Sequence, residues 1–71
     1  MFEGYRRTDI EHLIDEWIVG MNHAKRNRDI MRLKEIDGLT FEEIAEIHDL
    51  STVQVKNIVY QCRAKLKGKT V

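Results

Sequence analysis

Two start signals for helices, placed eleven residues apart, constrain the fold of this chain more than any other feature. Thr40 is followed three residues later by Glu43, and Ser51 is followed at the same distance by Gln54. Each pair matches a capping box, in which the two side chains satisfy free N–H groups at the start of a helix. The break between them leaves room for a turn of about three residues. The sequence therefore predicts two helices joined by a tight turn within residues 38–67.

Apolar residues predict which faces of these two helices are buried. In the second helix they recur at steps of four, three and four residues, with one more beside them: Val55, Val59, Cys62, Leu66 and Ile58. This spacing follows the helical period and marks one stripe. In the first helix, Ile44 and Ile47 are predicted to share a face, with the small Ala45 beside them. Both helices are expected to contribute these faces to one core.

The opposite face of the second helix is polar, aromatic and small. It carries Val53, Lys56, Asn57, Tyr60, Gln61 and Ala64, and the helix ends in the basic residues Arg63, Lys65, Lys67 and Lys69. A helix with such a front and a basic end fits a major groove flanked by phosphates. We predict contacts to bases or nearby phosphates from Thr52, Val53, Lys56, Asn57 and Tyr60, with Gln61 on the same face. We predict contacts to the DNA backbone from Arg63, Lys65 and Lys67.

Residues 27–67 resemble region 4 of bacterial sigma factors, and they are also similar to the helix-turn-helix of quorum-sensing-type response regulators. The matching positions are Gly38, Leu39, Thr40, Phe41, Glu42, Glu43, Ile44, Ala45, Glu46, Ser51, Val55, Lys56, Arg63 and Leu66. The resemblance implies an all-α, helix-turn-helix domain of the broad winged-helix-like class. It also implies that the domain binds double-stranded DNA, and that RNA polymerase is a further partner.

The chain departs from the family pattern at three positions. Asp49 stands where the turn usually has glycine, so we expect this residue to adopt a positive φ. His48 replaces an apolar residue, and Ile58 replaces a residue that is often arginine in sigma factors. The last change removes one expected contact to DNA, so the promoter preference of the family is not carried over.

The N-terminal part predicts another amphipathic helix. We expect residues 1–7 to be flexible and the pair Thr8 and Glu11 to form a third capping box. Apolar residues then recur at helical spacing: Ile10, Leu13, Ile14, Trp17, Ile18 and Met21. Gly20 and Asn22 mark the end of the helix. Either this face covers the core, or Ile14, Trp17 and Ile18 form a surface for a second copy or for RNA polymerase.

A further helix is predicted from about Ala24 to Ile36, ending in a turn at Asp37 and Gly38. Its apolar residues, Ile30, Met31, Leu33 and Ile36, spread over a wide arc, as in a helix between two others. Its first residues include the cations Lys25, Arg26 and Arg28, which oppose the helix dipole. Two partners can offset these charges: the acidic residues Asp15 and Glu16, or a DNA phosphate.

Composition and charge fit this outline. The 71 residues permit one domain with a small core, and the absence of proline favours helices. The single cysteine, Cys62, excludes an internal disulfide and suggests the cytoplasm, and we expect no signal peptide and no membrane span. The net charge is zero, but residues 39–50 carry four acidic and no basic groups, whereas residues 51–71 carry five basic and no acidic groups. Local charge decides phosphate contact, so we expect strongly salt-dependent binding.

The sequence contains no group of residues typical of a metal site or a catalytic site. His12, His23 and His48 are scattered without a second ligand at zinc spacing, and Cys62 lies on the predicted buried stripe. Glu42, Glu43 and Glu46 suit a solvated, capping face of a helix better than a general acid–base set. We therefore expect no metal, no cofactor and no enzymatic activity.

These observations predict a small, all-α, four-helix domain spanning residues 1–71. It would comprise a flexible N-terminus (1–7), two supporting helices (8–37), a helix-turn-helix (38–67) and a basic tail (68–71). The predicted function is sequence-specific binding of double-stranded DNA that regulates transcription, in a protein of phage or mobile-element type. Two alternatives remain open: an adaptor that contacts RNA polymerase through the Trp17 face, and an accessory of viral DNA packaging or recombination. Homodimerisation is a further expectation to test.

Overall fold

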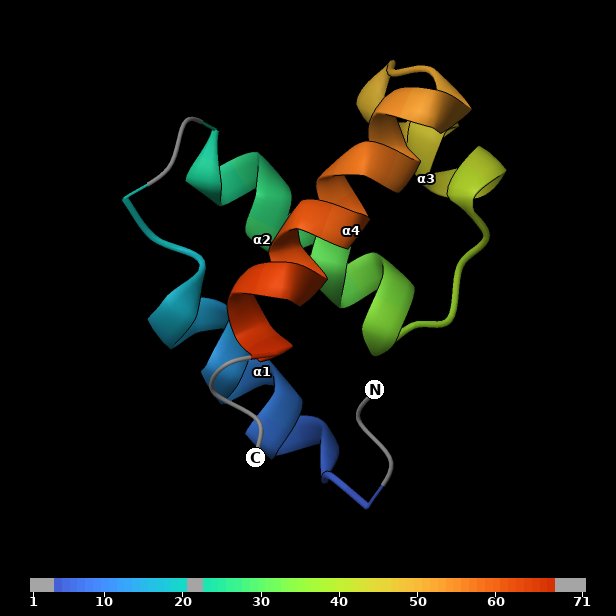
Figure 1. Ribbon diagram of the computed structural model, residues 1–71. Coiled ribbons are helices and arrows are strands. Elements are labelled where there is room, and N and C mark those ends of the chain that lie inside the picture. Colours follow the sequence, from blue (N-terminus) through green and yellow to red (C-terminus); the bar gives the residue numbers. More distant parts are fainter. Residues whose placement is uncertain (1–3, 21–22, 68–71) are drawn as a thin grey trace.

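The computed structural model describes residues 4–20 and 23–67, which form four helices (Figure 1). These are α1 (Arg7–Trp17), α2 (Ala24–Glu35), α3 (Phe41–His48) and α4 (Thr52–Lys67). The described residues contain no strand, so they hold no β-wing. The prediction of a small all-α domain is confirmed. None of the described helices combines the length and the apolar character needed to cross a bilayer.

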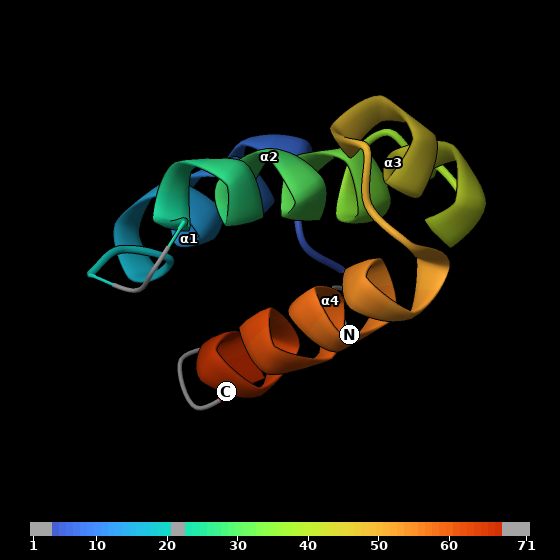
Figure 2. The ribbon, with the colours of Figure 1, turned by 90° about the horizontal axis from the view of Figure 1, so that it is seen from above.

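Helix α4 is the centre of the packing. It contacts α1, α2 and α3, and it crosses in front of α2 in Figure 1. Seen from above, α3 lies beyond the far end of α2 and connects to α4 through a short turn (Figure 2). The core contains residues of all four helices and the residue after α1: Ile10, Ile14, Ile18, Ile30, Met31, Ile44, Ala45, Val55, Ile58, Val59, Cys62 and Leu66. The stripe predicted for α4 is therefore buried throughout.

The turn between α3 and α4 has the predicted length and chemistry. Asp49 adopts a left-handed conformation with φ of 54°, as expected from its place in the turn. The N–H of Leu50 donates to the carbonyl of Ala45 at 2.9 Å and closes the end of α3. At the start of α4, the N–H of Ser51 donates to Gln54 Oε1 at 2.9 Å, and the N–H of Gln54 donates to Ser51 Oγ at 3.1 Å. Because the backbone and both side chains fix this junction, α4 leaves the turn in one direction.

Helix α3 begins with the other predicted capping box. The N–H of Thr40 donates to Glu43 Oε1 at 3.0 Å, and the N–H of Glu43 donates to Thr40 Oγ1 at 3.1 Å. Before it, α2 ends at Glu35, and Gly38 takes a φ of 73°. A positive φ of this kind favours glycine, which has no Cβ to clash with the backbone. The expected break at Asp37 and Gly38 is confirmed.

The start of α1 differs from the prediction. The helix begins at Arg7, and Asp9 Oδ2 accepts the N–H of Arg6 at 3.3 Å, so the box proposed for Thr8 and Glu11 does not form. Tyr5 is half-buried and packs against the core, so the folded part starts before residue 8. Residues 1–3 of the predicted flexible segment lie outside the described residues.

The predicted partner face of α1 is wrong for two of its three residues. Ile14 and Ile18 have no exposed surface, because α1 packs its apolar face against α2 and α4. Trp17 is half-buried against the same core. The alternative interpretation, in which this face covers the core, is confirmed. Met21 and Asn22, which the sequence placed at the end of this face, lie outside the described residues.

A second correction concerns α3, where Ile47 was expected to share the buried face of Ile44. Its side chain is 59% exposed. Helix α3 contacts α2 and α4 but not α1, so it lies at the edge of the domain. Only the side that carries Ile44 and Ala45 meets the core, which leaves Ile47 in solvent.

Polar contacts hold α1 against α2. Arg28 Nη1 donates to the carbonyl of Ile18 at 2.8 Å, at the end of α1. Arg32 forms an ion pair with Asp15. The acidic face of α1 was one of the two partners considered for the cations at the start of α2. Instead, Asp15 pairs with Arg32 further along that helix, and Arg28 is accommodated by a backbone carbonyl.

Candidate nucleic-acid interface

The exposed face of α4 contains most of the residues predicted to meet DNA. Val53 is 65% exposed and Tyr60 is 53% exposed. Lys56, Asn57 and Gln61 are also exposed, whereas the predicted contact Thr52 is half-buried. Helix α4 contains no aspartate or glutamate, so this face presents donors, acceptors and methyl groups without a charge that repels phosphate. These are the groups that read base edges in a major groove.

A ring that we did not predict as functional organises part of this face. Phe41, the first residue of α3, contacts the ring of Tyr60 edge-on, with centroids 6.2 Å apart and an interplanar angle of 79°. Lys34 Nζ lies 4.5 Å from the centroid of Phe41, and Lys56 Nζ lies 5.8 Å from it. Cation–π contacts of this kind favour these positions of the ammonium groups. Phe41 thus positions two predicted DNA contacts, Lys56 and Tyr60. The aromatic residue just after the Thr40 cap was the available signal.

The basic end of α4 serves the fold. Arg63 Nε donates to Glu35 Oε1 at 2.6 Å, and the two side chains are only 32% and 12% exposed. Lys65 Nζ donates to the carbonyl of Val19 at 3.0 Å. These contacts fix α4 to α2 and to the residues after α1. Arg63 and Lys65 therefore have protein partners, and their contacts to phosphates stay a prediction. Lys67 is exposed, and the tail from residue 68 lies outside the described residues.

A family model of sigma-70, region 4 matches residues 24–66, which include α2, α3 and all but the last residue of α4. The chain belongs to the sigma-70 region 4 family. It is thus a DNA-binding helix-turn-helix domain involved in transcription. No curated protein and no solved structure matches the chain.

Helix α1 of this region 4 domain lies outside the matched residues. It nevertheless supplies Ile10 and Ile14 to the core, and Ile18 follows directly after it. Family membership therefore accounts for the helix-turn-helix and for α2, whereas α1 is described by this structure alone.

The exposed face of α3 is acidic in this region 4 domain. Glu43 and Glu46 line a shallow pocket of about 300 Å³ together with Leu39 and Ile47. The pKa of Glu43 is lowered from its ordinary value, chiefly because its carboxylate accepts the N–H of Thr40 and also interacts with the Thr40 side chain. The role of Glu43 is therefore capping, as its position in the sequence indicated.

Cys62 lies within the core of the region 4 domain and has no exposed surface. Burial raises the pKa of its thiol, and the positive charges of Lys65 and Arg26 oppose that rise. A buried thiol with a raised pKa is a poor nucleophile. Among residues 4–20 and 23–67, no cluster of three potential metal ligands is present.

Proposed function

We propose that this region 4 domain binds a specific duplex sequence by placing the first half of α4 in the major groove, and that this binding regulates transcription. The role is one of binding rather than catalysis. The observation that carries the proposal is the exposed face of α4, where Lys56, Asn57 and Tyr60 stand together. The capping box at Ser51 and the ring of Phe41 hold this face in place.

The side chains on this face suit particular base edges. Asn57 and Gln61 carry amides, which can donate to and accept from adenine in a paired arrangement. Lys56 can donate to the two acceptors of guanine, and Val53 can pack against the methyl group of thymine. Tyr60 supplies a hydroxyl for a phosphate oxygen. The expected site is therefore a short sequence read by about four side chains.

Electrostatics support the same orientation. Helix α4 carries only basic charges, whereas the exposed face of α3 carries Glu42, Glu43 and Glu46. A duplex is attracted to the first surface and repelled by the second. Because the total charge is zero, non-specific affinity should be modest and should fall steeply with salt.

Selection of duplexes from a random pool, followed by affinity measurements on the selected site, tests this proposal. The variant Lys56→Ala/Asn57→Ala should lose preference for the selected site, by about 1–3 kcal/mol for each bidentate pairing with a base that it abolishes. The control variant Arg7→Ala/Thr8→Ala changes two exposed residues of α1 and should retain the preference. Equal preference in the α4 variant and the wild-type chain would reject the proposed orientation.

The adaptor alternative is less well supported by this structure. It required Ile14, Trp17 and Ile18 to offer an apolar surface, yet two of the three are fully buried. Measuring RNA polymerase binding of the Lys56→Ala/Asn57→Ala variant separates the two activities. Polymerase binding that survives loss of DNA preference would show that another surface serves the polymerase. A packaging or recombination role has no observation in its favour.

A further inference from the structure

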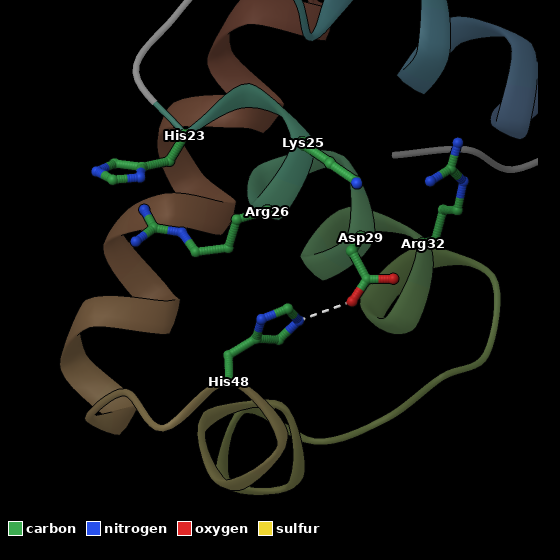
Figure 3. A pocket seen from close by; sticks show the side chains of 6 residues that line it. All are labelled: His23, Lys25, Arg26, Asp29, Arg32 and His48. Carbon is green, nitrogen blue, oxygen red and sulfur yellow. Dashed lines mark hydrogen bonds and ion pairs between the residues drawn. The ribbon is translucent and has the colours of Figure 1, made fainter.

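A basic cleft lies outside the exposed face of α4, between the first half of α2 and the end of α3 (Figure 3). Its volume is about 560 Å³, and it is lined by His23, Lys25, Arg26, Asp29, Arg32 and His48. In Figure 3, His23 and Arg26 extend to one side of α2, whereas Lys25 extends to the other. The cleft therefore presents cations across the whole width of the start of α2.

Among the described residues that line the cleft, the one acidic side chain is already paired within the fold. Asp29 Oδ2 lies 2.7 Å from His48 Nε2, and Arg32 is paired with Asp15 of α1. No carboxylate within the described residues lies at ion-pair distance from Lys25 or Arg26. Arg26 instead donates from two nitrogens to the neutral amide oxygen of Asn27, at 3.3 Å each. The cleft thus contains two cations that the fold does not neutralise.

The position of Lys25 and Arg26 at the start of α2 makes their positive charges less favourable electrostatically. The first turn of α2 contains no acidic residue, and the N-cap residue His23 makes no capping hydrogen bond with its side chain. The positive end of the helix dipole and two unpaired cations therefore lie together. An anion placed here offsets all three charges, and backbone N–H groups at a helix start are suited to phosphate.

Most residues that line the cleft lie on α2, which packs against α4. Arg26 of α2 and Lys65 of α4 both act electrostatically on the buried thiol of Cys62, so Arg26 lies near the second half of α4. Lys65 in turn donates to the carbonyl of Val19, in the segment between α1 and α2. The start of α2 thus lies beside α4, the helix that is proposed to enter the groove.

We propose that Lys25 and Arg26 bind backbone phosphates of the same duplex whose major groove receives α4. This inference rests on the proposed function, because it assumes that α4 faces a duplex. The partner is assigned as the duplex backbone because α2, which carries both cations, packs against α4, and because divergent side chains suit phosphates spaced along a strand. These contacts carry no sequence information, and they fix how the domain is oriented on the duplex.

Duplex affinity measured at several salt concentrations tests the inference. Each phosphate that a variant no longer binds should make the slope of log affinity against log salt less steep by about 1. Lys25→Gln and Arg26→Gln should each lower the slope by about one unit, and the double variant by about two. All three variants should weaken binding to selected and random duplexes by the same factor. The matched control Arg6→Gln/Arg7→Gln removes two exposed cations at the start of α1 and should leave the slope unchanged.

Several outcomes separate this inference from the proposed function. If Asn57→Ala abolishes sequence preference while Lys25→Gln/Arg26→Gln keeps the wild-type slope, α4 reads DNA and the cleft does not contact it. If the wild-type chain binds no duplex, both proposals are overturned. Circular dichroism checks that each variant folds, and Lys25→Gln, at an exposed position, decides the question if the double variant unfolds.

A free phosphate compound is the competing source of the same chemistry. Amide shifts of residues 23–29 are followed while inorganic phosphate or ATP is added without DNA. Weak shifts that require millimolar concentrations agree with a site built for the DNA backbone. Saturation by ATP at micromolar concentrations, together with an unchanged salt slope in the double variant, would assign the cleft to a small phosphorylated ligand and overturn the inference.

Discussion

The polar and basic residues of the two halves of α4 have different partners. Both contain polar and basic residues on the side away from the core. In the first half, Lys56 and Asn57 are exposed, and the Lys56 ammonium group lies near the ring of Phe41. In the second half, Arg63 pairs with Glu35, and Lys65 donates to the carbonyl of Val19. The first half is therefore available to a ligand, whereas much of the second half is committed to the fold.

This difference shows that a basic residue near the end of a recognition helix is not necessarily a phosphate contact. An ion pair between partly buried groups leaves little net charge for DNA to attract. Among the described residues, Lys25 and Arg26 at the start of α2 are cations without an ion pair. The proposed DNA-binding surface therefore combines the first half of α4 with the start of α2, which is distant from it in sequence.

The largest expected effect concerns the buried anchor of the second half. Leu66→Ala removes a side chain with no exposed surface and should lower the free energy of unfolding by about 3 kcal/mol. Val53→Ala, in the exposed half, should change it by less than about 0.5 kcal/mol. Urea denaturation followed by circular dichroism measures both. Similar losses in the two variants would contradict the burial of Leu66 and the exposure of Val53.

A smaller effect is expected from the ion pair of the second half. A double-mutant cycle with Arg63→Met and Glu35→Gln should give a coupling of about 1 kcal/mol in the free energy of unfolding, since the pair is partly screened by solvent. Arg63→Met should also leave the salt slope of duplex binding unchanged. If that slope becomes less steep by about 1, Arg63 contacts a phosphate and the comparison between the halves fails.

The exposed half can be tested through its supporting ring. Phe41→Leu keeps the side chain apolar but removes the cation–π contact to Lys56 and the edge contact to Tyr60. Duplex affinity should fall by about 0.5–1 kcal/mol, measured by fluorescence anisotropy. Phe41→Tyr retains a ring and serves as the control. An equal loss in both variants would show that the ring does not position these residues.

The smallest expected effect is a difference between the caps of α3 and α4 in how their contributions to stability depend on pH. Glu43 has a lowered pKa, so its ionised form stabilises the fold at neutral pH, and this contribution is lost as the pH falls through that lowered value. Gln54, in the corresponding place of α4, does not titrate. The stability difference between wild type and Glu43→Gln should therefore shrink on acidification, whereas that for Gln54→Ala should not. Urea midpoints between pH 7 and pH 3 measure both differences, and parallel curves would contradict this explanation.

Local patterns predicted the helix-turn-helix well because its determinants are close in sequence. The boxes at Thr40 and Ser51 each join residues three apart, and the positive φ of Asp49 follows from its place in the turn. The same kind of pattern gave the wrong start for α1. There Asp9 caps the N–H of Arg6, and Tyr5 packs against the core from just before the helix. The predicted cap at Thr8 and the observed cap at Arg6 lie two residues apart. The observed cap is next to Tyr5, which contacts the core.

The sequence pattern could not predict roles that depend on contacts between residues far apart in the chain. The apolar face of α1 was visible in the sequence, but the helices that cover Ile14 and Ile18 were not. Arg63 meets Glu35 twenty-eight residues away, and Lys65 meets Val19 forty-six residues away. The predicted contacts Lys56, Asn57 and Tyr60 could be placed on an outer face because the helical period alone separates them from Val55 and Val59.

The sequence by itself determined where α3 and α4 begin, how the turn between them is built and which stripe of α4 is apolar. Capping and helical periodicity act within a few residues, so a linear pattern contains them. Only the tertiary structure decided which cations are neutralised and which remain available to DNA. That outcome depends on which carboxylates and carbonyls the packing of α1, α2 and α4 brings within a few ångströms of each charge.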